Sequence, residues 1–482
     1  MTSADNAAIA AGIPGLVLME AAGLGVADEI TRRWQQRPVV VLCGPGNNGG
    51  DGFVVARFLA EAGWPVRLAS LGDVKNIKGD AAANAERWNG AILPMEPSIL
   101  GKGTLVVDAL FGAGLTRPLE GKALELIEAV NDQGLDCVGI DVPSGVDGDS
   151  GEIRGTAPRC VLTVTFFRRK PGHLLLPGRD LMGEVVVVDI GIPEVVLEDI
   201  NPQTFANEPD LWLSRFPLRS SGDNKYSHGH AVIVGGDEMT GAARLAATAA
   251  RRIGAGLATI AAPSSVFDAY ATGDPGNINS KVDDVVAFDE LIADPRKNAI
   301  LVGPGCGVNE RTRNLVLAAL DSGKPTVLDA DALSVFAEDA DILFSAITNA
   351  GPVLITPHDG EFSRIFNIQG DKLKRTVEAA TASGAFVLLK GADTVIAAPD
   401  GRSAINEGAP PTLATAGSGD VLAGFAVGLL AQGMDIFDAA TAACWLHGQA
   451  AANFGPGLIA EDLAVSLSAV LRALEIDANN SP

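Results

Sequence analysis

The stretch Ala414-Thr415-Ala416-Gly417-Ser418-Gly419-Asp420-Val421-Leu422-Ala423-Gly424 joins a glycine-rich turn to the start of an apolar run. Gly417 and Gly419 allow the backbone to turn its amide groups inward without obstruction by side chains. An amphipathic helix is predicted from Val421 to Leu430, so the turn lies at a helix N-terminus. Free N–H groups and the positive end of the helix dipole make such a turn an anion site.

Asp420 places a carboxylate beside this predicted anion site. A carboxylate next to a bound phosphate is unfavourable unless it performs a reaction step, such as taking a proton from an attacking hydroxyl. The alternative is that Asp420 caps the helix and the glycines form only a tight turn. The motif by itself leaves both interpretations open.

The chain has 482 residues, which is too long for a single core, so two or three domains are expected. Apolar residues make up 47% of it, enough for large buried cores. The 56 glycines and the aromatic content of only 5% suit α/β domains with many strand-to-helix turns.

The 36 basic and 59 acidic residues give a formal net charge of −23. A surface of this charge repels nucleic acid and anionic lipid, so neither is expected as a partner. If the ligand is anionic, the site must gather its own positive groups.

The five cysteines are scattered and form no zinc or disulfide pattern, which indicates a reducing cytoplasm. No N-terminal signal sequence is visible, and no apolar run reaches membrane-spanning length. We therefore expect a cytoplasmic protein with no membrane partner, and a homo-oligomer.

In the first half, continuous apolar runs predict buried parallel strands, each ending in a polar or glycine-rich loop. The strands are predicted at Val39 to Cys43, Val66 to Leu71, Leu105 to Asp108, Cys137 to Asp141, Leu162 to Phe167 and Val185 to Ile190. A helix is predicted from Phe53 to Ala62, after the loop Gly44 to Gly52. In open parallel sheets, ligands bind beyond the carboxyl ends of the strands, so these loops are expected to form one site.

Residues 192 to 218 carry four prolines with acidic residues between them, which indicates a domain boundary. We place the domains at 1–207 and 208–482. A new alternation of strands and helices follows this boundary and begins with a strand from Ala231 to Val234. A short hairpin is predicted over Thr394 to Ala398 and Ser403 to Ile405.

Gly44-Pro45-Gly46-Asn47-Asn48-Gly49 satisfies the GxGxxG pattern of a nicotinamide dehydrogenase, and Asp73 lies where a ribose-binding acid belongs. Two features argue against a dehydrogenase. The loop is more polar than a dinucleotide turn needs, and the neighbouring loops carry Asp108, Asp141 and Ser144. Hard oxygen ligands without His or Cys suit an alkali or alkaline-earth cation. Simple loop capping by Asp108 and Asp141 is the alternative.

Four motifs together resemble the NAD(P)H-hydrate epimerase family over residues 1 to about 195. They are Leu18-Met19-Glu20-Ala21-Ala22-Gly23, Gly44 to Gly52, Val107-Asp108-Ala109-Leu110-Phe111-Gly112 and Asp141-Val142-Pro143-Ser144-Gly145. The resemblance implies a Rossmann-like fold that interconverts the R and S epimers of hydrated NADH or NADPH (NADHX and NADPHX).

The resemblance also implies roles for particular residues. Asp141 would contact the hydrate and transfer a proton, and Lys170 matches a family lysine, although Arg168 to Lys170 also fits a solvated basic turn. The K⁺ ligands would be Asn48, Asp108 and Ser144. The residues that hold the hydrate would be Asn47, Asn48, Gly49, Gly50, Asp51, Gly112, Ala113, Gly114, Leu115, Thr116, Arg117, Pro118 and Asp141.

A second series of motifs resembles the ribokinase-like superfamily, and within it ADP-dependent NAD(P)H-hydrate dehydratase, over residues 215 to 475. The motifs are Gly303-Pro304-Gly305-Cys306-Gly307, Asp329-Ala330-Asp331-Ala332-Leu333, Thr356-Pro357-His358-Asp359-Gly360-Glu361-Phe362, Leu389-Lys390-Gly391-Ala392-Asp393-Thr394 and the turn before Asp420. The resemblance implies two three-layer α/β/α domains in all, the first Rossmann-like and the second ribokinase-like.

By this resemblance, Gly241, Ala242, Gly307, His358 and Asp420 would contact the hydrate. The nucleotide would be held by Lys390, Gly391, Ala392, Asp393, Thr394, Gly417, Ser418 and Gly419. ADP would phosphorylate the hydroxyl on the reduced ring with Asp420 as the base, because phosphate is a better leaving group than hydroxide. Mg²⁺ would bridge the phosphates.

The sequence therefore predicts a bifunctional repair enzyme. The alternatives are a vitamin-precursor kinase with an accessory nucleotide-binding domain, a non-enzymatic nucleotide-sensing module in the first half, and a dehydrogenase. A ribokinase-like fold alone would allow the kinase, because fold does not fix function.

Overall fold

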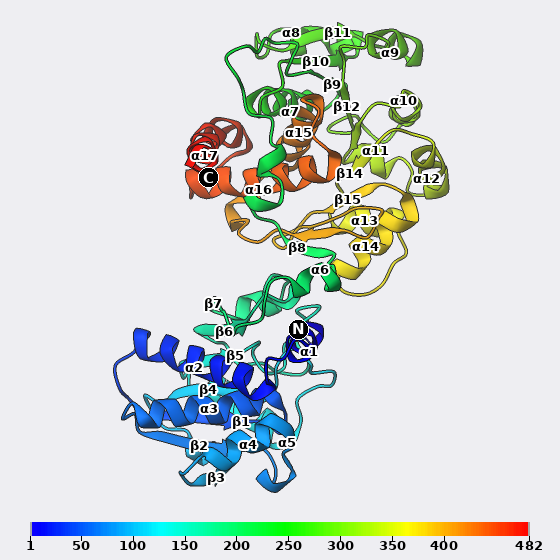
Figure 1. Cartoon of the computed structure of the whole chain (residues 1–482). Coiled ribbons are helices and arrows are strands. Elements are labelled where there is room, and N and C mark those ends of the chain that lie inside the picture. The colour runs from blue at the N-terminus through cyan, green and yellow to red at the C-terminus, as the bar shows by residue number, and fades with distance from the viewer. Residues whose placement is uncertain (1, 481–482) are drawn as a thin grey trace. The chain divides into compact units, whose positions relative to one another are not determined.

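The computed structural model describes residues 2–480 and forms two α/β units, Met1–Pro202 and Gln203–Pro482 (Figure 1). The sequence placed the boundary five residues later, after residue 207. The difference arises from β8 (Thr204–Ala206), which pairs in parallel with β17 (Ser403–Ile405) and so adds an edge strand to the second sheet.

The first unit contains a parallel sheet of seven described strands in the order β3-β2-β1-β4-β5-β6-β7. Its strands are β1 (Val39–Cys43), β2 (Val66–Ser70), β3 (Ile92–Pro94), β4 (Leu105–Ala109), β5 (Cys137–Ile140), β6 (Leu162–Phe166) and β7 (Glu184–Val188). Its helices are α1 (Thr2–Ala10), α2 (Gly15–Arg33), α3 (Asn47–Glu61), α4 (Gly79–Arg87), α5 (Gly121–Asp132) and α6 (Val196–Ile200). The order reverses between β1 and β4, as in Rossmann-like sheets.

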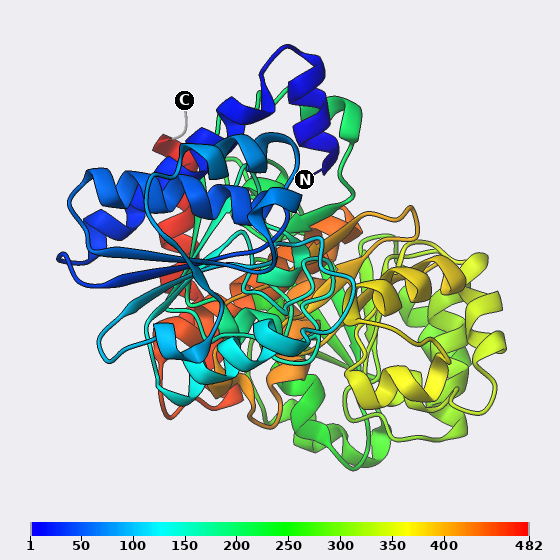
Figure 2. The ribbon, with the colours of Figure 1, turned by 90° about the horizontal axis from the view of Figure 1, so that it is seen from below.

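The central strand β1 shows why a continuous apolar run forms a buried strand. Val39 and Val41 pack into the core beneath α2, α3 and α4, whereas Val40 and Leu42 pack into the opposite core beneath α5. Both faces of the sheet are therefore covered, and every residue of β1 is buried. Figure 2 shows the blue helices on one side of the first sheet and the cyan helix α5 on the other.

The predicted start of the helix after β1 was wrong. The sequence predicted a loop from Gly44 to Gly52 before a helix at Phe53, but α3 already begins at Asn47. Gly49 and Gly50 lie inside its first turns, where added Cβ atoms would come within 1.9 Å of Gly44 O and 2.6 Å of Met19 Sδ. These glycines allow the helix to pack closely on its neighbours, which the sequence pattern did not reveal.

The second unit contains a sheet of ten described strands in the order β11-β10-β9-β12-β13-β14-β15-β16-β17-β8. Its further strands are β9 (His230–Val234), β10 (Leu257–Ala262), β11 (Ile278–Lys281), β12 (Ala299–Val302), β13 (Thr326–Leu328), β14 (Val353–Ile355), β15 (Phe386–Leu389) and β16 (Val395–Ala397). The predicted hairpin is confirmed, because β16 and β17 pair in antiparallel register.

Helices cover both faces of this second sheet (Figure 1). One face carries α7 (Thr240–Arg252), α15 (Ser418–Ala431), α16 (Ile436–Phe454) and α17 (Ala460–Asn480). The other carries α9 (Val285–Ile292), α10 (Glu310–Asp321), α11 (Asp331–Ser334), α12 (Ala340–Thr348), α13 (Asp359–Ile365) and α14 (Lys372–Ser383). The short helix α8 (Phe267–Ala271) follows β10. Both units are thus three-layer α/β/α folds, as predicted.

The helix after the glycine-rich turn is not amphipathic, contrary to the sequence interpretation. Every residue from Val421 to Ala431 is buried, because α7 packs on one side of α15 and α16 on another. Gly424 and Gly428 permit the contact with α7, since added Cβ atoms would lie 2.4 Å from Ala246 O and 2.7 Å from Ala250 O. Close packing on both sides fixes the N-terminus of α15, and with it Asp420.

Candidate active sites

The loops after β1, β4 and β5 meet at the point where the strand order of the first sheet reverses. Gly112 shows how closely they meet, because a Cβ there would lie 2.9 Å from Asp141 Oδ2 and 3.4 Å from Asn48 Oδ1. The structure therefore brings three predicted residues from three loops into one centre. Ligands of open α/β sheets bind in this position.

Asp141 follows the last residue of β5 and has a φ of 68°, a left-handed conformation that a non-glycine residue rarely adopts. Its Oδ2 accepts a hydrogen bond of 3.0 Å from Ala113 N, and its Oδ1 lies 2.5 Å from Lys170 Nζ. Unusual backbone conformations of this kind persist where surrounding contacts hold them, often at functional sites. Lys170 is therefore buried in an ion pair, and the interpretation of Arg168 to Lys170 as a solvated turn was wrong for this residue.

Thr165 joins the two charged groups. Its Oγ1 accepts a hydrogen bond of 2.7 Å from Lys170 Nζ and donates one of 3.1 Å to Asp141 Oδ1. Burial by itself would raise the pKa of Asp141, but the Lys170 ammonium and the hydrogen bonds from Lys170 and Ala113 lower the pKa to about 2. Asp141 is therefore ionised at neutral pH.

His173, to which the sequence analysis assigned no role, holds the backbones of Asp141 and Lys170 in place. Its Nδ1 accepts a hydrogen bond of 2.8 Å from Lys170 N, and its Nε2 donates one of 2.8 Å to Asp141 O. Burial, followed by the nearby Lys170 charge, lowers the His173 pKa to about 4. A neutral imidazole thus ties together the backbones of the lysine and the aspartate. Neither Thr165 nor His173 belonged to a predicted motif, although a threonine inside an apolar strand was a usable signal.

Asp51 lies in the second turn of α3 and is 9% exposed. Burial, together with the negative charges of Asp141 and Asp5, raises its pKa well above the usual value. Asp5 comes from α1, a helix that the sequence did not connect with this site. In the first centre, the surroundings therefore favour the ionised form of Asp141 and the protonated form of Asp51.

Asp108 and Ser144, two of the predicted K⁺ ligands, contact each other at the bottom of the centre. Asp108 Oδ2 accepts from Ser144 N at 2.7 Å, and Oδ1 accepts from Ser144 Oγ at 2.6 Å. Burial raises the Asp108 pKa, and no ion pair offsets this among the described residues. Asn48 Nδ2 is buried without a hydrogen-bond partner among the described residues. The buried Asp108 carboxylate, which forms no ion pair with a described residue, fits a cation site nearby, whereas the free amide N–H of Asn48 fits a hydrogen-bond acceptor.

In the second unit, the loops after β13, β14 and β15 and the start of α15 form the other centre. Lys390 Nζ donates to Asp329 Oδ1 at 2.7 Å and lies 3.7 Å from Glu361 Oε2. A Cβ on Gly419 would lie 3.6 Å from the same Nζ. The structure therefore places a lysine ammonium at the glycine-rich turn, where an acidic protein needs a local positive charge.

Asp420 lies in the first turn of α15 and is half-buried. Burial and the negative charge of Asp329 raise its pKa to about 6, although Lys390 acts in the opposite direction. Gly417 has a φ of 86°, and a Cβ there would lie 2.8 Å from Leu245 Cδ1, so the turn requires glycine. No side-chain cap by Asp420 is present at this helix start, so the capping interpretation was wrong.

His358 caps α13 in a reciprocal arrangement with Glu361. His358 Nδ1 accepts from Glu361 N at 3.1 Å, and Glu361 Oε2 accepts from His358 N at 2.8 Å. The His358 side chain is 54% exposed, so its other face is open to a ligand. His447 holds the start of α15, because its Nε2 donates to Ser418 O at 2.9 Å.

The remaining predicted residues lie in loops at the same edge of the sheet. Gly307 N donates to Asp331 Oδ2 at 2.8 Å, and Gly391 N donates to Thr394 Oγ1 at 3.1 Å. Asp393 pairs with Lys372 at 2.7 Å, so its carboxylate has a structural partner. Gly241 and Ala242 begin α7. A Cβ on Gly241 would meet no atom within 4 Å, which leaves its surface free for a ligand.

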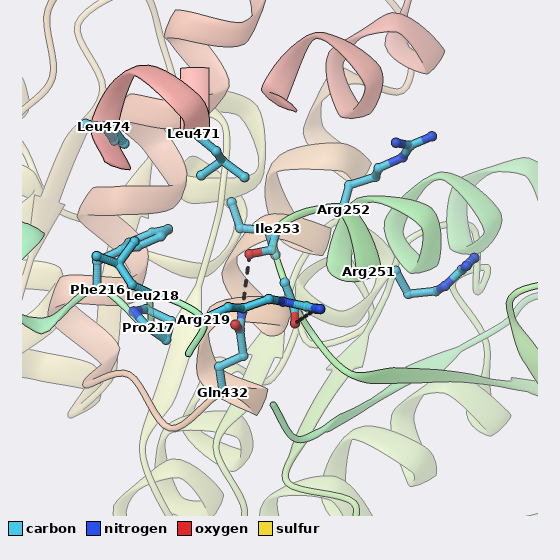
Figure 3. A pocket seen from close by; sticks show the side chains of 11 residues that line it. Phe216, Pro217, Leu218, Arg219, Arg251, Arg252, Ile253, Gln432, Leu471 and Leu474 are labelled. Carbon is cyan, nitrogen blue, oxygen red and sulfur yellow. Dashed lines mark hydrogen bonds between the residues drawn. The ribbon is translucent and has the colours of Figure 1, made fainter. Parts of the chain in front are cut away.

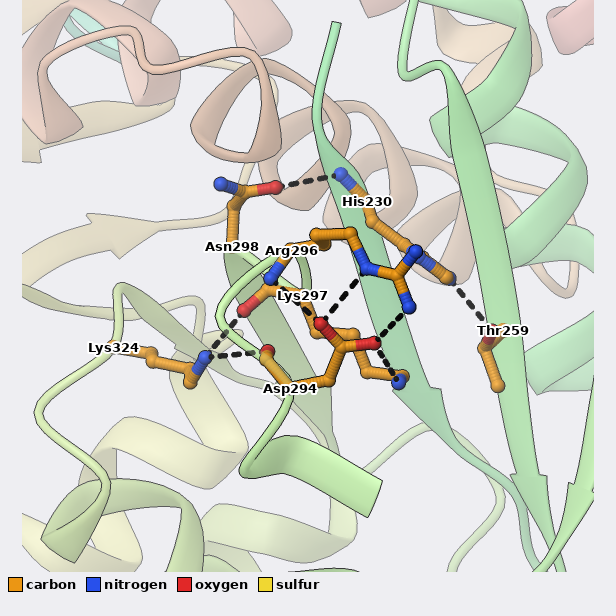
Figure 4. Close-up of polar contacts among 7 residues, drawn as sticks. All are labelled: His230, Thr259, Asp294, Arg296, Lys297, Asn298 and Lys324. Carbon is orange, nitrogen blue, oxygen red and sulfur yellow. Dashed lines mark hydrogen bonds and ion pairs between the residues drawn. The ribbon is translucent and has the colours of Figure 1, made fainter. Parts of the chain in front are cut away.

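The second unit also contains a cavity and a charged cluster that lie apart from the centre around Asp420. A cavity of about 150 Å³ lies at the end of α7, where Gln432 and Arg219 donate to the carbonyls of Ile253 and Gly254 (Figure 3). At the amino ends of β9 and β12, Asp294 pairs with Arg296 and Lys297 (Figure 4). These charges are paired with one another and lie at the opposite edge of the sheet from Asp420.

Among the described residues, no group of three or more His, Cys, Asp or Glu side chains is arranged to hold a metal ion. The same part of the chain contains no helix long and apolar enough to cross a membrane. All five cysteines are buried and free.

Comparisons with known proteins match both units. The family model described as NAD(P)H-hydrate dehydratase matches residues 231–471, and that of the YjeF-related protein N-terminus matches residues 15–172. The bifunctional NAD(P)H-hydrate repair enzyme of Moorella thermoacetica is 37% identical, over 96% of this chain and 93% of that protein. That of Coxiella burnetii is 35% identical, over 95% of this chain and 95% of that protein.

A ribokinase-like superfamily protein from Enterococcus faecalis is similar in structure, with 22% identity, a TM-score of 0.50 and coverage of 56% of this chain and 96% of that chain.

The two folds define a two-domain α/β protein with a candidate reaction centre in each unit. The relatives cover nearly the whole chain, so both units share one family. The chain belongs to the bifunctional NAD(P)H-hydrate repair enzymes, which combine an epimerase domain and a dehydratase domain. This assignment confirms the predicted function and does not favour the vitamin-precursor kinase.

Replacing Thr165 by valine removes the hydroxyl between Asp141 and Lys170 while keeping the shape of the side chain. We expect the epimerase kcat/KM to fall by about tenfold or more, because a hydrogen bond to a charged group contributes about 1.5–3 kcal/mol. The rate is measured by chromatographic separation of the two hydrate epimers, without ADP.

Thr163→Val is the matched control. Thr163 lies on the same strand, is also fully buried, and donates to Met182 O at 2.7 Å, away from the charged pair. Both variants should lose about 1 kcal/mol of stability, but only Thr165→Val should lose activity. Equal activity of the two variants would contradict the proposed positioning of the pair by Thr165.

Proposed function

We propose that the first unit interconverts the R and S epimers of NADH or NADPH hydrate, and that the second unit dehydrates the S form while converting ADP to AMP and phosphate. The observation that carries this proposal is that each unit has its own carboxylate–lysine centre at the carboxyl edge of its own sheet. Damage that produces both epimers can then be repaired completely by a dehydratase that accepts only one.

In the first unit, Asp141 and Asp51 are pushed toward opposite protonation states. Such a divergence assigns the acid and the base of a reaction that transfers protons in both directions. Epimerisation can open the bond between the hydroxyl-bearing carbon and the ring nitrogen and close it again on the other face. One group must then take the hydroxyl proton as the carbonyl forms, another must protonate the departing nitrogen, and both transfers reverse on closure. We assign Asp141 as the base and Asp51 as the proton donor, with Lys170 and Thr165 holding Asp141.

The loop from Gly112 to Pro118 and the start of α3 surround this centre. Gly112 leaves room beside the Asp141 carboxylate, and Ala113 N fixes that carboxylate from the other side. Asn47 at the start of α3 and Gly114 and Thr116 on the loop are exposed, so they can contact the remainder of the hydrate. Gly49 and Gly50 act through packing, which keeps Asn48 and Asp51 in place.

A K⁺ ion fits beside Asn48, Asp108 and Ser144. Its oxygen ligands would come from these side chains, and its charge would offset the burial of the Asp108 carboxylate. The ion would supply fixed positive charge near the substrate. The residues themselves connect the loops after β4 and β5, since Ser144 Oγ also accepts from Phe111 N at 2.9 Å.

In the second unit, Asp420 takes the proton of the hydrate hydroxyl as the β-phosphoryl group of ADP transfers to that oxygen. The N–H groups of the Gly417–Gly419 turn and the Lys390 ammonium stabilise the charge on the transferring group. Phosphate then leaves, and reduced cofactor, AMP and phosphate result. Lys390 to Thr394 and the turn hold the nucleotide, and Mg²⁺ is proposed to enter with its phosphates.

The dehydratase hydrate site combines Gly241, Ala242, Gly307, His358 and Asp420. The open surface at Gly241 and the exposed imidazole of His358 support contact with the hydrate. We also propose a cytoplasmic location, which the five free cysteines support. A homo-oligomeric state stays a prediction.

Product analysis tests this function directly. The full chain is incubated with mixed-epimer NADPH hydrate, Mg²⁺, K⁺ and ADP, and the products are separated chromatographically. We expect one AMP and one phosphate for each NADPH formed, with no phosphorylated compound accumulating. A stable phosphorylated product would favour a small-molecule kinase, and no ADP-dependent NADPH would exclude the dehydratase.

The two activities should differ in their dependence on pH. Asp420 must be ionised to act as a base, and its raised pKa of about 6 means that the dehydratase kcat should fall about tenfold per unit below pH 6 and level off above pH 7. The epimerase should show no acid limb in this range from Asp141, whose pKa is lowered to about 2. Initial rates between pH 5 and 8, corrected for the spontaneous reactions, measure both profiles.

Removing Lys390 provides the second arm of this experiment. Lys390 lowers the Asp420 pKa, so Lys390→Met should move the acid limb of the dehydratase to higher pH as well as reduce its rate. The epimerase profile of the same variant serves as the control and should not change. A limb that stays in place would show that Asp420 is not the group that titrates.

A further inference from the structure

A cavity of about 150 Å³ lies in the first unit beside the carboxyl ends of β2 and β4. Its walls are apolar and polar in equal measure and come from three elements. Leu71 follows β2, Phe111, Leu115 and Leu119 come from the loop between β4 and α5, and Ala123 lies in α5. A cavity of this volume has room for a single aromatic ring system, and its polar part can bind the polar groups attached to such a ring.

The same loop forms both this cavity and the wall of the reaction centre. Ala113 N donates to Asp141 Oδ2 at 3.0 Å, whereas Leu115, two residues later, lines the cavity. The Phe111 backbone is held in place, because its N–H donates to Ser144 Oγ at 2.9 Å. One loop therefore contacts Asp141 and also lines the cavity, so a long ligand bound at Asp141 can extend into the cavity.

The position of the cavity relative to the strand order indicates which end of the ligand it receives. Asp141 follows β5, on one side of the reversal between β1 and β4, whereas Leu71 follows β2, on the other side. Dinucleotides bind across such a reversal, with their two halves on opposite sides of it. A hydrate whose reacting ring lies at Asp141 therefore extends its adenosine end toward the cavity.

Arg117 lies at the rim of this cavity with an exposed side chain. No hydrogen bond, ion pair or ring contact engages its guanidinium among the described residues. An unpaired arginine is unusual on a chain with a net charge of −23, and a guanidinium matches the geometry of a phosphate. Glu120, the one acidic residue of the lining, is suited to accept from a ribose hydroxyl.

Asp73, the acid that would select against a 2′-phosphate, does not line this cavity. Asp73 lies shortly after β2, where folds selective for NAD place an acid that binds the 2′-hydroxyl of the adenosine ribose. In this structure its side chain accepts from Lys75 N at 3.0 Å and caps the short 3₁₀ turn Val74–Asn76. The arginine, rather than this acid, lines the cavity.

We infer that this cavity is the adenosine subsite of the epimerase unit and that Arg117 binds the 2′-phosphate of NADPH hydrate. The inference rests on the proposed epimerase function. It assigns to the first unit a preference for the NADPH form, a choice that the sequence motifs left open.

The test measures epimerisation of NADPH hydrate and of NADH hydrate by the full chain without ADP, so that the dehydratase does not consume the products. Arg117→Ala should lower kcat/KM for NADPH hydrate by about tenfold or more, because a hydrogen-bonded charge pair is lost. Its effect on NADH hydrate should be less than about threefold. Arg117→Lys should retain part of the preference.

Arg159→Ala is the matched control. Arg159 is also exposed and its side chain makes no hydrogen bond or ion pair within residues 2–480, but it precedes β6 and so lies at the amino edge of the sheet. It removes the same charge from the same unit and should leave both rates unchanged. Adenosine 2′,5′-bisphosphate should inhibit wild-type epimerisation competitively and more strongly than 5′-AMP, and Arg117→Ala should abolish this difference.

The outcomes separate this inference from the proposed function. If wild type epimerises neither hydrate, the function itself fails. If wild type epimerises both and Arg117→Ala slows both equally, Arg117 contacts a group common to the two hydrates and the 2′-phosphate assignment is overturned. The assignment is equally overturned if Arg117→Ala slows neither hydrate.

Discussion

A carboxylate held against a lysine at the carboxyl edge of a parallel sheet is the interaction on which both halves of this protein depend. In the first unit, Asp141 and Lys170 are 2.5 Å apart, and the pair is largely buried. Burying two charges is costly unless hydrogen bonds satisfy them. Thr165 and His173 provide those bonds and also hold the left-handed backbone of Asp141. The sheet, the loops and the surrounding glycines keep this small arrangement in place.

The two centres use the same components with opposite electrostatic results. Lys170 lies directly against Asp141 and lowers its pKa to about 2. In the second unit, Lys390 lies directly against Asp329 instead, so Asp420 is left with burial and a negative neighbour that raise its pKa to about 6. A carboxylate with a pKa of about 6 suits removal of a hydroxyl proton at neutral pH, because it is ionised at that pH and yet binds a proton more readily than an ordinary carboxylate. The position of each lysine thus accounts for the different pKa values of Asp141 and Asp420.

Much of this architecture could be predicted from the sequence, because apolar runs such as Val39 to Cys43 are unambiguous when both faces of a strand are buried. The loops at the strand ends carried the motifs, so Asp141, Asn48, Asp108 and Asp420 could be named in advance. The amphipathic interpretation of α15 failed because local pattern does not reveal that a helix is enclosed on all sides. Thr165 and His173 were missed because their roles depend on contacts with Asp141, a residue distant in sequence. Asp5 was missed because no sequence pattern indicates that α1 lies near Asp51 and Asp141.

The central claim is that two independent centres act in sequence on the two epimers. The most direct measurement follows the absorbance of the reduced nicotinamide ring after ADP, Mg²⁺ and K⁺ are added to mixed-epimer NADPH hydrate, for wild type, Asp141→Asn and Asp420→Asn. The account predicts nearly complete recovery for wild type, and no ADP-dependent recovery for Asp420→Asn. Asp141→Asn should recover the S epimer rapidly and the rest only at the spontaneous epimerisation rate. Equally fast and complete recovery by Asp141→Asn, or any substantial recovery by Asp420→Asn, would contradict it.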